Sequence, residues 1–196
     1  MFTSTEWEEC KWSKIVKGKA AYSTVLNIGF WNGVTMCLKV FAPLVKVLRL
    51  VDGDIKPAMG FLYGELIKAK EEIKVALKNS ENTYRPILEI VDSKAKDRLD
   101  TPLHMTAYLL NPFYCYKDPW IAKEGALLDA VCSCLERLFP DDIEKQTRIL
   151  MTDLAKYTGK EGAFGKLTAQ KACENNNSTY DPGNNKCSLV YYYITI

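Results

Sequence analysis

The sequence predicts an all-α fold, an irregular bundle of about six to eight helices with a short C-terminal tail that has strand propensity. Three observations support this prediction. Apolar residues recur at helical spacing along most of the chain, proline and glycine separate the periodic segments, and only the last nine residues combine high β-propensity with a lack of charge. We therefore expect a helical domain of residues 1–182, followed by a divergent tyrosine-rich tail of residues 183–196.

The first predicted helix starts after Ser4 and Thr5, where the acidic residues that follow favour a helix N-terminus. We expect it to end near Lys17, because Gly18 interrupts the pattern.

A buried helix is predicted from Ala20 to Pro43, because apolar residues recur at near-helical spacing up to the proline. These residues are Tyr22, Val25, Leu26, Gly29, Trp31, Val34, Leu38 and Phe41. The chain stays apolar from Leu44 to Val51, and residues 52–54 form a predicted turn.

The clearest amphipathic helix begins at Pro57, since proline is typical of a first helical turn, and its apolar stripe continues to Leu77. The remaining predicted helices are residues 83–98, 102–111, 120–139, 143–157 and 167–173. The pair Asn111-Pro112 is expected to stop one of them, because proline disfavours helix in the residue before it.

Composition and charge argue against several functional classes. The net charge of +2 and the pI near 8.1 fall short of the pI above about 9 that is typical of dedicated nucleic-acid modules. No apolar run approaches the roughly 18–20 residues that cross a bilayer, and the N-terminus lacks the apolar core of a presequence. We expect an intracellular protein, cytoplasmic or nuclear, with no membrane span.

The cysteine and histidine content does not indicate a metal site. The seven cysteines are Cys10, Cys37, Cys115, Cys132, Cys134, Cys173 and Cys187. They are odd in number and form no C-x-x-C pair, so we expect reduced thiols that pack as small apolar side chains. With His104 as the single histidine, we expect no catalytic residue, no cofactor and no metal, although a Cys-His nucleophile stays open because such pairs meet only in space. Three glycines spaced by three near residue 162 favour a flexible connection over phosphate binding, since no strand precedes them.

Two segments are candidate binding surfaces. A basic N-terminal stretch with tryptophans suits contact with nucleic acid, and its residues are Lys11, Lys14, Lys17 and Lys19. The alternative is a solvated helix face whose tryptophans pack inward. The last nine residues of the tail, which carry no charged side chain, suit strand addition to a partner protein, and the candidate interface residues are Leu189, Tyr191, Tyr192, Tyr193 and Ile194. The alternative there is an aggregation-prone segment.

Several stretches resemble the plant hAT-type transposases and their domesticated relatives. They are Met1–Trp7, Phe30–Trp31, Pro43–Arg49, Val51–Gly53, Lys56–Gly60, Pro102–His104 and Ala107–Pro112. Together they span roughly residues 1 to 182 in the order expected for the family. Such transposases contain a zinc-finger domain, an RNase H-like core with two aspartates and a glutamate, a helical insertion within that core, and a dimerisation region.

The resemblance implies the helical insertion alone. The matched stretches begin after both catalytic aspartates and end before the motif that supplies the glutamate, and residues 183–196 replace a tryptophan pair expected after Asp181-Pro182. We therefore expect a non-catalytic protein-interaction module that self-associates and binds a host protein or interferes with it, with toxic or regulatory effect. The alternatives are a weak nucleic-acid-binding remnant and a residual enzyme.

Overall fold

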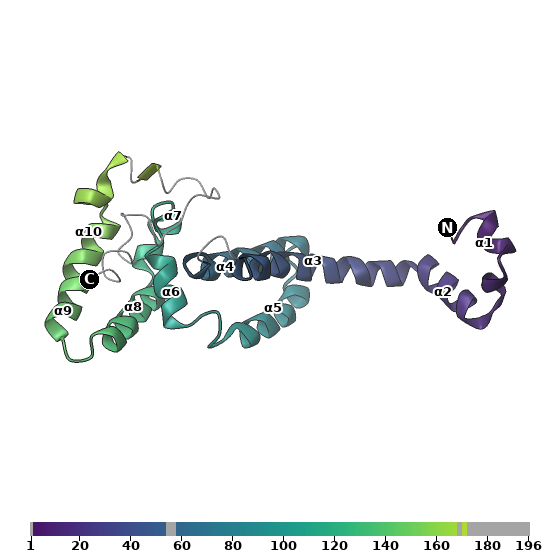
Figure 1. Cartoon of the computed structure of the whole chain (residues 1–196), viewed down its shortest axis with the longest axis horizontal. Helices are drawn as coiled ribbons and strands as arrows, with labels where there is room; N and C mark the ends of the chain where they lie inside the picture. The colour runs from purple at the N-terminus through teal and green to yellow at the C-terminus, as the bar shows by residue number, and fades with distance from the viewer. Residues whose placement is uncertain (1, 54–57, 168–169, 172–196) are drawn as a thin grey trace.

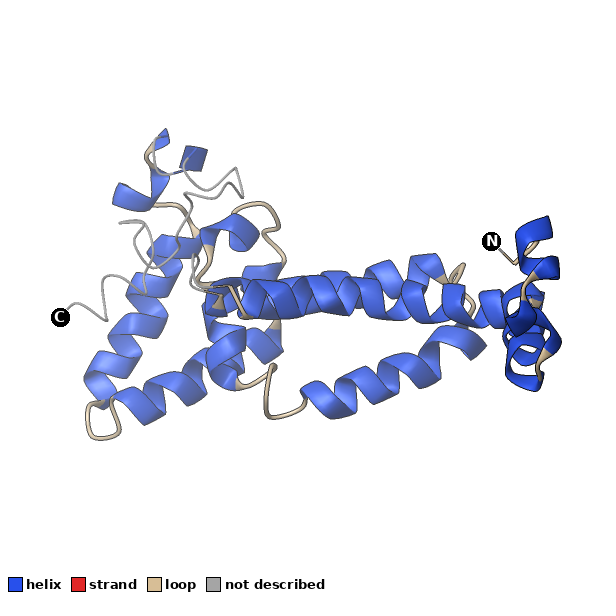
Figure 2. Cartoon of the chain, turned by 45° about the vertical axis from the view of Figure 1, so that its right-hand side comes forward, coloured by secondary structure: helices blue, strands red, loops and turns tan. Residues whose placement is uncertain are grey.

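The computed structural model describes residues 2–53, 58–167 and 170–171. Among these residues every regular element is helical, which confirms the predicted all-α irregular bundle (Figure 2). The tail of residues 183–196, with its predicted strand, lies outside the described part. No helix in the described ranges has both the length and the apolar character that a membrane crossing requires.

The molecule is elongated around one long helix, α3 (Ile28–Val51). Figure 1 shows α3 as a rod, with the N-terminal elements at its far end and a compact body at the other. The helices beside and beyond the rod are α4 (Met59–Ala76), α5 (Glu81–Ala95), α6 (Pro102–Leu109), α7 (Pro112–Cys115), α8 (Gly125–Leu138), α9 (Ile143–Arg148) and α10 (Leu154–Thr158).

The N-terminal arm is more broken than the sequence predicts. In place of one helix to Lys17, it forms α1 (Thr5–Glu9), a 3₁₀ turn at Lys11–Lys14 and α2 (Val16–Leu26). The predicted break at Gly18 is wrong, because α2 runs through this buried glycine. A Cβ at Gly18 would overlap the carbonyl oxygen of Trp12, so glycine permits the turn to pack closely on α2.

The predicted helix from Ala20 to Pro43 is divided at Asn27 and then extended. The Asn27 side chain caps α3 by accepting hydrogen bonds from the backbone N–H groups of Gly29, at 2.7 Å, and Phe30, at 3.3 Å. The helix does not end at Pro43, which is buried in its interior. Proline inside a helix costs about 3 kcal/mol, and the apolar residues on both sides of Pro43 offset this cost by packing on α4.

Helices α3 and α4 form the central pair, and α5 joins them through a tight turn. Val47 of α3 packs with Leu62 of α4, and Ile73 of α4 packs between Met36 and Leu88. Lys78 and Asn79 adopt positive φ angles in the turn that leads to α5. In both views α5 diverges from the α3–α4 pair toward its C-terminal end (Figures 1 and 2).

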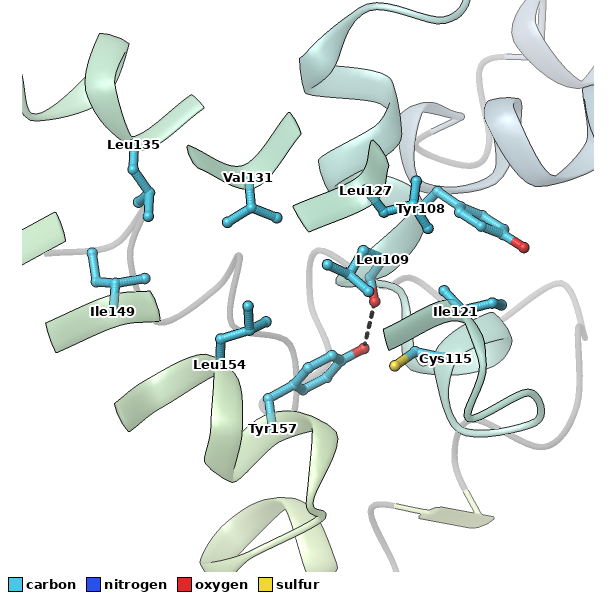
Figure 3. Packing of buried hydrophobic residues seen from close by; sticks show 10 residues of the cluster. All are labelled: Tyr108, Leu109, Cys115, Ile121, Leu127, Val131, Leu135, Ile149, Leu154 and Tyr157. Carbon is cyan, nitrogen blue, oxygen red and sulfur yellow. Dashed lines mark hydrogen bonds between the residues drawn. The ribbon is translucent and has the colours of Figure 1, made fainter. Parts of the chain in front are cut away.

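The compact body has its own core, in which α6, α8 and α10 meet (Figure 3). Tyr157 is fully buried there, and its hydroxyl donates a hydrogen bond to the Leu109 carbonyl at 3.2 Å. The predicted stop at Asn111-Pro112 is confirmed. Buried Asn111 caps α7 and donates from its side-chain nitrogen to the Gly60 carbonyl at 2.7 Å, which fixes α6 and α7 to α4.

The last described elements follow the predicted pattern with local differences. The predicted helix of residues 120–139 begins as a 3₁₀ turn at Ile121–Lys123 before α8. The helix predicted over residues 143–157 contains a π-helical turn at Ile149–Asp153, which joins α9 to α10. Gly162–Gly165 form another 3₁₀ turn, and most of the helix predicted over residues 167–173 lies outside the described ranges.

Candidate protein-interaction surface

Helix α3 presents apolar side chains on two opposite faces. The inner face packs against α4 and comprises Met36, Val40, Pro43, Leu44, Val47 and Leu50. Residues at this spacing return to one side of a helix, because each turn takes 3.6 residues. This face accounts for the attachment of α3 to the rest of the molecule.

The outer face carries six apolar residues at alternating spacings of three and four. We call them the outer seam: Trp31, Val34, Leu38, Phe41, Val45 and Leu48. Five of the six expose between 41% and 64% of their surface, and Val34 is half-buried. The sequence predicts that this segment is buried, and this prediction is wrong, because none of the described elements of the chain covers the outer face. Alternating three- and four-residue spacing is the pattern of a helix that packs along another helix.

A groove adjoins the outer seam. It has a volume of about 620 Å³ and lies between α3, α4 and α5. Leu62 and Leu66 of α4 contribute to it, and eight residues of α3 between Met36 and Val51 line its length. Phe41 and Leu48 belong both to the groove and to the outer seam, so the two form one continuous apolar surface.

Almost all side chains that line this surface are uncharged. Within the described part of the chain, Lys94 is the one charged residue that lines the groove. The ion pairs nearby lie at the surface: Lys46 contacts Glu72 at 2.9 Å, and Lys70 pairs with Asp92. Exposed ion pairs of this kind contribute about 0–1 kcal/mol each to stability. The apolar side chains therefore determine how this surface interacts.

The four lysines predicted to bind nucleic acid lie at the far end of the rod. Lys11 and Lys14 belong to the 3₁₀ turn, Lys17 and Lys19 belong to α2, and all four are exposed. The Lys11 ammonium lies 4.8 Å from the centre of the exposed Trp12 ring. The alternative prediction, in which both tryptophans pack inward, is therefore wrong for Trp12.

Trp7 differs from Trp12 in its surroundings. It is half-buried, and its ring packs edge-on against Phe2 with the ring centres 4.6 Å apart. The candidate interface residues of the tail, Leu189, Tyr191, Tyr192, Tyr193 and Ile194, lie outside the described residues, so their role stays a prediction.

The titratable groups of the body are engaged in packing. His104 accepts or donates a hydrogen bond at Nδ1 with the Thr101 hydroxyl, at 2.7 Å, and burial lowers the pKa of its imidazole below the usual 6.5. Burial raises the pKa of the Cys115 thiol to about 11, which keeps it protonated and unreactive near neutral pH. Across the described ranges, no group of three or more His, Cys, Asp or Glu residues is arranged to hold a metal ion.

The outer seam is the candidate surface that the sequence prediction misses. The signal is present in the sequence, because the three-four spacing continues across Pro43 without interruption. A second apolar stripe lies on the opposite side of the same helix. The periodicity predicts burial for Trp31, Val34, Leu38 and Phe41 and does not distinguish the second stripe, although a separate element is needed to cover each stripe.

Comparison with protein-family models, with curated proteins and with solved structures finds no match to this chain. The resemblance to hAT-type transposases therefore stays a prediction, and the geometry of α3 and the groove carries the functional argument.

Proposed function

We propose that this chain is a non-catalytic protein-interaction module that self-associates through the outer seam of α3 and the adjoining groove. The supporting observation is the exposed apolar surface of α3. Contiguous exposed apolar patches larger than a few hundred Å² are uncommon on monomers and mark protein contacts. Eight large side chains of α3 are exposed: Ile28, Phe30, Trp31, Leu38, Phe41, Val45, Leu48 and Val51.

Their combined exposed surface is on the order of several hundred Å², since the three aromatic side chains carry about 150–250 Å² each and roughly half of each is exposed, and the five aliphatic side chains add to this. A stable interface takes about 800 Å² from each partner. These eight side chains spread over more than half of the helix circumference, so the outer seam supplies part of such an interface and the flanks beside it supply the rest.

The resemblance to hAT-type transposases agrees with this proposal. In that family the helical insertion packs against the catalytic core, so a detached copy would expose apolar surface that the core once covered. Binding to a host protein inside the cell, with regulatory or toxic effect, would use the same surface. A metal-dependent DNA-cleavage assay should give no signal, and metal-dependent cleavage by the purified chain would contradict the non-catalytic assignment.

The test compares two leucine substitutions in sedimentation experiments. Leu38 of the outer seam and Leu138 at the end of α8 are exposed to 62% and 67%, so glutamate should leave the fold intact at either position. Burying a leucine contributes about 1.5–3 kcal/mol, so covering the exposed three fifths of Leu38 in both copies contributes about 2–4 kcal/mol. We expect Leu38→Glu to raise the dissociation constant at least about 30-fold. Leu138→Glu should associate like the native chain, and equal association of both variants would refute the proposal.

Weak nucleic-acid binding is the second candidate, because the exposed Trp12 contacts Lys11 in a stretch that carries four exposed lysines. Lysines that neutralise phosphates make binding fall steeply with salt, and tryptophan provides a stacking surface for bases. We expect single-stranded DNA to bind at low salt and to be released as salt rises. Absence of binding at low salt would remove this candidate.

A further inference from the structure

We infer that the groove is occupied by α3 of a second copy of this chain, which runs antiparallel about a two-fold axis between Leu38 and Phe41. The inference rests on the proposed self-association and adds the occupant, its direction and its register. It follows from the order of residues along the outer seam, from the extent of the groove, and from the polarity of the positions that flank the seam.

The outer seam is self-complementary when it is reversed. A two-fold axis midway between Leu38 and Phe41 places apolar residues opposite apolar residues in every layer. The layers are Trp31 with Leu48, Val34 with Val45, and Leu38 with Phe41, each pair occurring twice. An interface of this kind uses the same patch on both copies, as two-fold dimers do.

The same register places the N-terminal part of α3 from the second copy opposite the groove. The α3 residues that line the groove extend from Met36 to Val51. In the antiparallel register, residues 28–43 of the second copy lie opposite them, a stretch of about 24 Å. These residues include the first turns of α3, which project beyond the α3–α4 pair toward α2 in Figure 1. Each copy would therefore cover the part of the other copy that its own described elements leave exposed.

The positions beside the seam favour the antiparallel direction. One flank is apolar and consists of Phe30, Cys37, Leu44 and Val51; the other consists of Ile28, Thr35, Ala42 and Arg49. In an antiparallel pair, each flank of one copy lies against the same flank of the second copy. In a parallel pair, each flank of one copy lies against the opposite flank of the second copy. A parallel dimer would place the exposed Arg49 against the apolar flank of the second copy, beside Leu44 or Val51, and loss of water around a cation is unfavourable. Among the described residues α3 also has no acidic side chain that could compensate Arg49 across the interface.

Site-specific photo-crosslinking tests the direction directly. The photoreactive residue p-benzoylphenylalanine replaces Ile28, which is 77% exposed at the start of α3. A mixture of ¹⁵N-labelled and unlabelled full-length chain identifies adducts between copies by mass spectrometry. We expect the adduct on residues 48–52 of the second copy, because Ile28 lies on the same flank as Arg49 and antiparallel pairing brings these flanks of the two copies together at this level. The same probe in place of Met151, an exposed residue of the body, serves as the control and should give no adduct on α3.

A second probe at the other end of α3 controls for a disturbance of the structure by the first probe. The photoreactive residue in place of Val51 should form its adduct on residues 27–31 of the second copy, and Leu38→Glu should abolish both adducts. Adducts on residues 26–31 from position 28 would indicate parallel helices and overturn this inference, while self-association would stand. Association by mass without adducts on α3 would also overturn it. A monomeric native chain at all concentrations would instead refute the proposed function.

Discussion

Replacement of Gly64 by alanine should destabilise the protein, although alanine favours helices. Gly64 lies in α4 where two tyrosine rings approach the backbone. A Cβ there would lie 2.5 Å from Tyr114 Cζ and 2.8 Å from Tyr108 Cε2. Carbon atoms normally pack at about 3.5–4.0 Å, so the overlap approaches 1 Å. Movement of Tyr114 is restricted, because its hydroxyl donates to Glu65 at 3.1 Å and its ring packs on Tyr108.

The magnitude follows from a comparison with Gly33→Ala. Overpacking of a core costs about 1–3 kcal/mol, and the helix propensity of alanine offsets up to about 1 kcal/mol of this. Gly33 lies in α3 with no atom within 4 Å of its ideal Cβ, so only the propensity gain applies there. We expect Gly64→Ala to unfold at lower urea than the native chain, and Gly33→Ala at equal or higher urea, with the two variants differing by the overpacking cost of about 1–3 kcal/mol. Circular dichroism at low protein concentration measures both, and equal stability of the two variants would refute the packing described around α4.

Three further outcomes test other parts of the structure. The imidazole of His104, the only histidine, should titrate by NMR below pH 6.5. Because the pKa is lowered in the folded protein, its contribution to stability is present above pH 6.5 and is lost as pH falls toward the folded pKa; His104→Gln should remove this part of the acid sensitivity. Iodoacetamide should modify exposed Cys37 quickly and buried Cys115 slowly, and the rate at Cys37 should fall as protein concentration rises, because Cys37 lines the groove. A chain that ends at Pro182 should associate as the full chain does if the outer seam dominates; loss of association would assign the contact to the tail.

Local signals in the sequence predict much of the helical body. The start of α6 at Pro102 and its stop at Asn111 follow from proline and asparagine chemistry that acts within a few residues. Gly18 shows the limit of such signals. Its lack of a side chain serves a close approach to Trp12, a contact across six residues that helix propensity does not describe.

The candidate surface could be predicted only in part. Periodicity identifies the residues that share a face of α3, such as Leu38 and Phe41, but it does not determine whether another element covers that face. Coverage depends on the path of α5, which diverges after the turn at Lys78 and Asn79 and leaves the groove open. The spacing of lysines and tryptophans in the sequence predicts the basic stretch near Trp12, and the structure shows these lysines exposed at the end of the rod.

In the proposed dimer, a second copy of the chain covers the outer seam of α3. Amide hydrogen exchange of the native chain, measured at low and high protein concentration with the molar mass of each sample, tests it most directly. An interface of this size corresponds to dissociation constants of about micromolar or tighter, so mass should rise from 22.2 kDa toward that of two chains by roughly 100 μM. Exchange over residues 28–51 should slow with this rise, while exchange over α8 stays constant. A rise in mass with unchanged exchange in α3 would contradict the account.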